Sequence, residues 1–127
     1  MLINYPGDRK RWRDAVTERE RKRYEALFAS NRGLLLAPSQ QSHISPIVVR
    51  DLWIRSRLPL SELEYIWNLV APHNDEPAAF LSKEEFVVGL WLIDQRLKGR
   101  KLPVKVSETV WASVRGLQGI KVKKFSG

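Results

Sequence analysis

Residues 81–103 read LSKEEFVVGLWLIDQRLKGRKLP, and this stretch decides the fold class. Ser82 and Glu85 have the spacing of a capping box, in which two side chains satisfy backbone N–H groups at a helix start. The apolar residues that follow recur at helical spacing. That stripe consists of Phe86, Leu90, Ile93 and Leu97. The pattern predicts a helix that runs to about Lys98, where Gly99 suits its C-terminal end.

Upstream of this segment, capping signals predict three further helices, separated by loops at 31–42 and 71–79. The signals are Thr17 with Glu20, Ser45 followed by Pro46, and Ser61 with Glu64. The second of these helices is expected over about 46–56. After Pro103 a short amphipathic piece at about 107–115 precedes a basic tail. No strand of ordinary length is predicted, so we expect an all-α fold of two helix–loop–helix pairs with a short C-terminal helix.

Two successive helix–loop–helix units suggest paired EF-hands, whose calcium loops need oxygen ligands at positions 1, 3, 5, 9 and 12 and a glycine at 6. With Glu85 as position 12, the earlier positions are degenerate. They are Asn74 at 1, Glu76 at 3, Ala78 at 5 and Ala79 at 6. The first loop has no Asp or Glu between residues 29 and 49. We therefore predict no metal site and no cofactor, and leave weak calcium binding at the second loop open.

The chain has 127 residues, no cysteine and a net charge of +8, which suits one domain in a reducing compartment. Lys and Arg outnumber Asp and Glu by eight to four in residues 1–23 and by nine to one in 95–127. In residues 24–94 the acids lead by nine to five. A nucleic-acid-binding fold more often carries its basic stripe on the folded body, so we do not expect nucleic acid as the partner.

An enzyme is not expected. The two histidines, His43 and His73, fall in predicted loops, and no glycine-rich phosphate loop or nucleophile motif accompanies them. Nor is there an apolar run of the roughly 18 residues that a membrane span requires. We expect a monomeric cytoplasmic protein, peripheral to membranes at most.

A set of short motifs in a fixed order carries a resemblance to a known family. The motifs are SRLP at 56–59, Leu63, IWNL at 66–69, LSKEEFVVGLWLI at 81–93 and KLP at 101–103. In this order they resemble the EH domain, a paired EF-hand module of trafficking proteins. The resemblance implies a domain over 17–103, with a basic N-terminal flank at 1–16 and a basic C-terminal extension at 104–127.

Three departures from the family are visible: both loops are longer than usual, and Trp53 stands where leucine is general. The long first loop, with YEALFASN at 24–31, resembles the fungal branch named for increased rDNA silencing. Proteins of that branch are similar to regulators of a phosphoinositide 5-phosphatase and are tied to autophagy. The resemblance thus implies such a phosphatase or an autophagy scaffold as partner.

In the EH family, an Asn-Pro-Phe turn enters an apolar pocket between the second and third helices. Carried over by position, the resemblance implies a site made of Val49, Arg50, Trp53, Leu63, Glu64 and Trp67. The spacing agrees in part, because each helix contributes apolar residues four apart. The expected function is a non-enzymatic adaptor in membrane trafficking, phosphoinositide regulation or autophagy.

Two alternatives remain. The basic residues near the last long helix could meet anionic phosphoinositide membranes or nucleic acid, with the pocket blocked by Trp53. These residues are Arg96, Lys98, Arg100, Lys101 and Lys105. Alternatively, the partner docks on another face, around Tyr24 and the 31–43 loop. The simplest interpretation of any one tryptophan at helical spacing is core packing, and that of the charges is a solvated surface.

Overall fold

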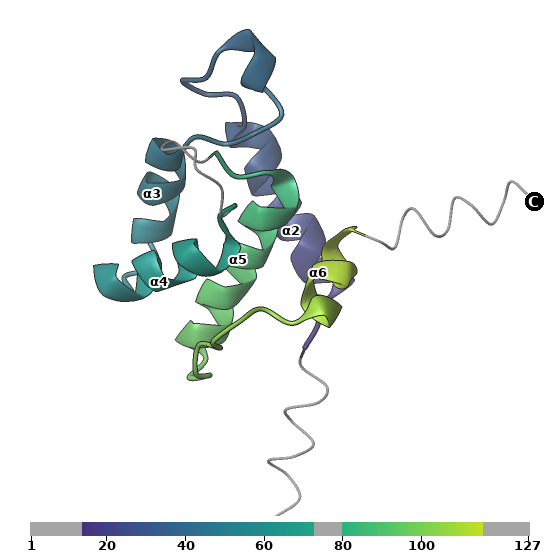
Figure 1. Ribbon diagram of the computed structural model, residues 1–127, viewed down its shortest axis with the longest axis vertical. Helices are drawn as coiled ribbons and strands as arrows, with labels where there is room; N and C mark the ends of the chain where they lie inside the picture. Colours follow the sequence, from purple (N-terminus) through teal and green to yellow (C-terminus); the bar gives the residue numbers. More distant parts are fainter. Residues whose placement is uncertain (1–13, 73–79, 116–127) are drawn as a thin grey trace, which may run out of the picture.

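The computed structural model describes residues 14–72 and 80–115. Within that part the chain forms five α-helices and one short 3-10 turn, and no strand (Figure 1). The elements are α2 (Glu18–Asn31), the 3-10 turn (Pro38–Gln40), α3 (Pro46–Ile54), α4 (Leu60–Val70), α5 (Lys83–Leu97) and α6 (Glu108–Arg115). The all-α prediction is confirmed.

Side-chain caps start three of these helices as the sequence predicts. At α2 the Thr17 hydroxyl accepts from the Glu20 N–H at 3.1 Å, and the Glu20 carboxylate accepts from the Thr17 N–H at 2.9 Å. Ser82 and Glu85 make the same reciprocal pair at α5, at 3.3 and 2.8 Å. Ser45 caps α3 by accepting from the Ile47 N–H at 3.1 Å. Each cap satisfies donors that the first helical turn leaves without a partner.

The predicted capping box of Ser61 and Glu64 is wrong. Helix α4 begins at Leu60, two residues earlier than a cap at Ser61 requires, and Pro59 is the residue that precedes it. The Pro59 carbonyl accepts from the Glu62 and Leu63 N–H groups at 2.9 and 3.1 Å. Pro59 ends the preceding turn with extended backbone, so Ser61 already lies inside the first helical turn and its side chain caps nothing.

Helix α5 lies at the centre of the molecule, between the α3–α4 pair on one side and α2 and α6 on the other (Figure 1). Its buried apolar residues therefore occupy more than one face. They are Phe86, Val87, Val88, Trp91, Leu92 and Ile93. The single predicted stripe was too narrow, and its last member, Leu97, is 52% exposed. A helix covered on several sides needs apolar residues around most of its circumference.

The two interhelical loops are joined by one antiparallel bridge between Ile44 and Leu81. The Ile44 N–H donates to the Leu81 carbonyl at 2.9 Å, and the Leu81 N–H returns a bond of 3.1 Å. Both side chains are fully buried. This bridge couples the two helix–loop–helix units into the paired arrangement that the sequence predicts.

The helix that follows Pro103 also packs into the core. Val106, Val110 and Val114 are buried, and α6 lies along α5. The Val16 N–H donates to the Ser113 hydroxyl at 2.9 Å, which ties the start of the described chain to α6. In the described ranges, no helix is both long enough and apolar enough to cross a bilayer.

Candidate functional site

A tight turn at 55–59 places α3 and α4 side by side. Arg57 takes a positive φ of 69°, and its N–H donates to the Ile54 carbonyl at 3.0 Å. The Ser56 hydroxyl accepts from the Leu58 N–H at 3.2 Å, which fixes the second half of the turn. The chain changes direction here within five residues, so α4 runs crosswise to α3 (Figure 1) and one face of each helix borders the same hollow.

These two faces enclose a hollow of about 360 Å³, here called the α3–α4 groove. All six residues that the sequence analysis assigned to peptide binding line it: Val49, Arg50, Trp53, Leu63, Glu64 and Trp67. Two more were missed, Pro46 and Leu60. Each adds the first member to a series at i, i+3, i+4 and i+7, so helical spacing alone could have found them.

The groove is apolar inside and charged at its edge. Val49, Trp53 and Leu63 are buried, and Trp67 is half-buried. Arg50 and Glu64 are exposed. Among the described residues, the side chains of Arg50 and Glu64 take no part in an ion pair or hydrogen bond. A cation and an anion are therefore available at the mouth of an apolar hollow.

Trp53 forms the inner wall of the groove. Its ring lies 6.2 Å from that of Trp67, at an interplanar angle of 65°, which is an edge-on aromatic contact. The six-membered ring of the indole reaches α5, where Gly89 leaves room for it. The indole Nε1 is buried and has no hydrogen-bond partner in the described chain. The hollow lies beside this indole, with Trp53 among its lining residues.

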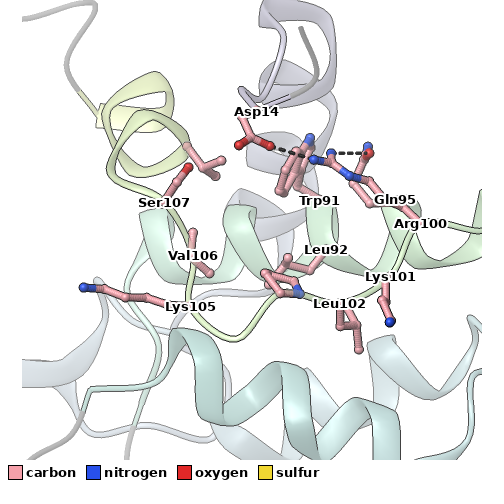
Figure 2. Close-up of a pocket in the computed structure, with 12 residues that line it drawn as sticks. Asp14, Trp91, Leu92, Gln95, Arg100, Lys101, Leu102, Lys105, Val106 and Ser107 are labelled. Carbon is pink, nitrogen blue, oxygen red and sulfur yellow. Dashed lines mark hydrogen bonds and ion pairs between the residues drawn. The ribbon is translucent and has the colours of Figure 1, made fainter. Parts of the chain in front are cut away.

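A second, smaller cavity of about 130 Å³ lies between α5, α6 and the connection that joins them (Figure 2). Arg100 dominates its polar side. The guanidinium donates to Asp14 at 2.7 Å and to Gln95 at 3.1 Å, and it lies 5.7 Å from the centre of the Trp91 ring. Its charge is thus already partnered by a carboxylate and an aromatic face.

The five cations considered for lipid contact are not equivalent. Arg96 forms a two-pronged ion pair with Glu62, both bonds 3.1 Å, and these hydrogen bonds raise the pKa of Arg96 above its ordinary value. Arg100 is paired with Asp14. Lys98, Lys101 and Lys105 are exposed. In Figure 2 the side chains of Lys101 and Lys105 extend away from each other.

Of the degenerate calcium positions, Asn74 and Glu76 lie outside the described residues, as does His73. The third, Glu85, uses its carboxylate to cap α5. Over 14–72 and 80–115, no three His, Cys, Asp or Glu residues are grouped as metal ligands. His43 contacts the Ser42 hydroxyl at 3.1 Å through Nδ1.

The other predicted docking face, around Tyr24 and the 31–43 loop, contains both buried and exposed residues. Tyr24 is buried, and its hydroxyl donates to the Asp94 carboxylate, so its ring is not offered to a partner. In the 31–43 loop, the Gln41 amide donates to the carbonyls of Gly33, Leu36 and Ala37 at 3.2 to 3.3 Å. Leu35 is 77% exposed at a positive φ of 65°.

Comparisons with known proteins agree with this architecture. The model of the EH domain family matches residues 16–114. Increased rDNA silencing protein 4 of Neosartorya fischeri is 51% identical over 140 residues, covering 95% of this chain and 27% of that protein. Its counterpart in Pyricularia oryzae is 54% identical over 128 residues, covering 91% of this chain and 18% of its own length. This chain therefore spans about a quarter or less of these relatives.

Among solved structures, the second EH domain of AtEH1/Pan1 has the same fold, with a TM-score of 0.62 at 24% identity. The match covers 76% of this chain and 85% of that one. The resemblance predicted from the ordered motifs is confirmed, and so is the similarity to the fungal increased-rDNA-silencing proteins. This chain belongs to the EH domain family.

Proposed function

We propose that this chain is a non-enzymatic interaction module that binds Asn-Pro-Phe-type peptides in the α3–α4 groove. EH domains are protein-interaction modules, and the assignment of peptide binding to the α3–α4 groove depends on one observation. Two neighbouring helices align matching faces around a hollow of about 360 Å³ with two indoles among its lining residues. That volume falls in the range of small-ligand pockets.

In this proposal the peptide's Phe ring enters between Leu63 and Trp67, where it replaces water against apolar surface. Arg50 donates to peptide carbonyls at the mouth, and the Glu64 carboxylate accepts from peptide N–H groups. Burying a Phe side chain of roughly 150–200 Å² at about 25 cal/mol/Å² contributes on the order of 4–5 kcal/mol before losses. Association then costs several kcal/mol of translational and rotational freedom.

Weak binding follows from that balance, with a Kd of roughly micromolar to millimolar. A weak module works through several motifs or several domains that act together. We therefore propose an adaptor role in membrane trafficking, phosphoinositide regulation or autophagy, in the cytoplasm. Its partner would be an Asn-Pro-Phe-containing phosphoinositide 5-phosphatase or autophagy scaffold. This partner class is the one that the resemblance to the increased-rDNA-silencing branch implies.

The test is a titration of an Asn-Pro-Phe peptide into the labelled chain, followed by amide shifts in NMR spectra. We expect shifts concentrated at 49–53 and 63–67, and their loss in a folded Trp67→Ala variant. Trp111→Ala is the matched control, because Trp111 is also a partly buried tryptophan but lies on α6, away from the groove. An Asn-Pro-Ala peptide controls for the Phe ring. No shifts with millimolar peptide would contradict the proposal.

The dependence of binding on salt concentration distinguishes peptide binding from the membrane alternative. Pocket binding should change less than about twofold between low and moderate ionic strength, because it depends mainly on apolar burial. Binding of vesicles that contain phosphoinositides should weaken steeply over the same range. Vesicle binding without any peptide binding would favour the alternative based on Lys98, Lys101 and Lys105.

A further inference from the structure

We propose that Gly89, on α5 behind the groove, is the positioning residue that keeps the Trp53 indole out of the binding space. Gly89 does not line the α3–α4 groove. Its effect would be transmitted through Trp53, which does. The consequence for peptide binding rests on the proposed function, whereas the packing relation between the two residues stands by itself.

The geometry leaves no room for any side chain at position 89. A Cβ built on Gly89 would lie 2.4 Å from Cζ2 and 2.8 Å from Cη2 of Trp53. Carbon atoms in close-packed interiors approach to about 3.5–4.0 Å, so one of the two groups would have to move.

The backbone does not require glycine at this position. Among the glycines of the described chain, only Gly33 and Gly99 have positive φ. Gly89 lies inside α5, where glycine is less favourable than alanine by its loss of backbone freedom. Glycine at position 89 weakens its own helix, and its presence there is therefore explained by the space that the Trp53 indole occupies.

The structure around Trp53 also determines the direction in which its indole would move. Helix α5 is central and packs against α2, α3, α4 and α6, so its backbone is held from several sides. The neighbouring Val88 is fully buried. The indole is 3% exposed and is flanked by Trp67, at 6.2 Å between ring centres. The open space beside the indole is the α3–α4 groove, so a methyl group at position 89 should push Trp53 into it.

The experiment compares four chains: wild type, Gly89→Ala, Trp53→Leu and the double variant. Gly89→Ala should weaken Asn-Pro-Phe peptide binding at least about tenfold and lower the melting temperature, although alanine favours helices. In the Trp53→Leu background the same change should leave peptide affinity within about threefold and raise the melting temperature. This reversal of sign is the signature of a direct coupling between the two residues.

A readout without peptide makes the two proposals separable. The indole N–H resonance of Trp53, assigned by its loss in Trp53→Leu, should shift in Gly89→Ala because the ring leaves its buried position. If wild type binds no peptide, the proposed function fails, while the resonance and the sign reversal in melting temperature still decide the role of Gly89.

Two outcomes would overturn the inference. In the first, Gly89→Ala binds peptide like wild type and melts at a higher temperature, which means that the methyl group is accommodated. In the second, Gly89→Ala and the double variant both fail to fold, which means that the added atom meets something other than the indole. A double variant that folds when Gly89→Ala does not would support the pairing.

Discussion

Tyr24 and Asp94 connect α2 to α5 at the edge of the core. Tyr24 is 5% exposed, and its hydroxyl donates to the Asp94 carboxylate, which also accepts from Arg23 at 3.5 Å. Desolvation by burial, followed by the hydrogen bond to Asp94, raises the pKa of Tyr24 well above its ordinary value. The neutral phenol is therefore the form that the folded chain favours.

This pKa difference predicts a loss of stability in alkali. Above about pH 10 the unfolded chain releases the Tyr24 proton while the folded chain keeps it, so the free energy of unfolding falls as pH rises. Tyr24→Phe removes this titration and should make the fall between about pH 9.5 and 11 shallower. At neutral pH the same variant should lose about 1–2 kcal/mol with its hydrogen bond.

Urea unfolding at a series of pH values measures both effects. Tyr65→Phe is the matched control, since it removes an exposed hydroxyl that donates to the Pro103 carbonyl at 2.8 Å and leaves Tyr24 in place. Of the two variants, Tyr24→Phe should have the shallower slope above pH 9.5. An unchanged slope in Tyr24→Phe would show that the alkaline loss arises elsewhere.

At the scale of the element, two serines with the same sequence signature have different roles. Ser82 caps α5 through its hydroxyl, whereas Ser61 lies within the first turn of α4 and caps nothing. Ser82→Ala should cost about 1 kcal/mol of unfolding free energy. Ser61→Ala should stay within about 0.5 kcal/mol of wild type, because it changes an exposed helical residue.

Chemical denaturation of the two variants under one condition is sufficient for this comparison. Equal losses would mean that Ser61 contributes a cap that the geometry of Pro59 does not indicate. The comparison also bears on the groove, because α4 supplies Leu63, Glu64 and Trp67, and its first turn follows Pro59 directly.

At the scale of the whole molecule, both ends of the described chain join the core. Val16 is buried and bonded to Ser113, Asp14 pairs with Arg100, and α6 contributes Val110 and Val114 to the interior. The sequence predicts that the domain ends at Pro103, so residues 17–103 should fold independently. Truncation of the chain tests this prediction.

A chain trimmed to residues 17–103 should melt at least several degrees below one trimmed to 14–115. The shorter chain exposes the surface of α5 that α6 covers and loses four buried valines, Val16, Val106, Val110 and Val114, and each buried methylene contributes about 0.8 kcal/mol. Thermal unfolding followed by circular dichroism measures the difference. Equal melting temperatures would support a domain that ends at residue 103.

Local signals in the sequence determined the helix count, the caps at Thr17, Ser45 and Ser82, and the end of α5 just before Gly99. The Gly99 N–H donates to the Arg96 carbonyl, and the Arg100 N–H to that of Gln95. All of these are interactions between residues a few positions apart, which sequence spacing encodes. The two groove faces were predictable for the same reason, since each consists of residues three or four apart on one helix.

Only the tertiary structure decided which of these faces meet and what lies behind them. The sequence left open whether Trp53 fills the pocket or lines it, because the answer depends on Gly89, 36 positions away on another helix. The place of α6 in the core and the pairing of Arg100 with Asp14 are equally remote in sequence. Contacts of this kind depend on the close packing of side chains from separate helices, which no local pattern records.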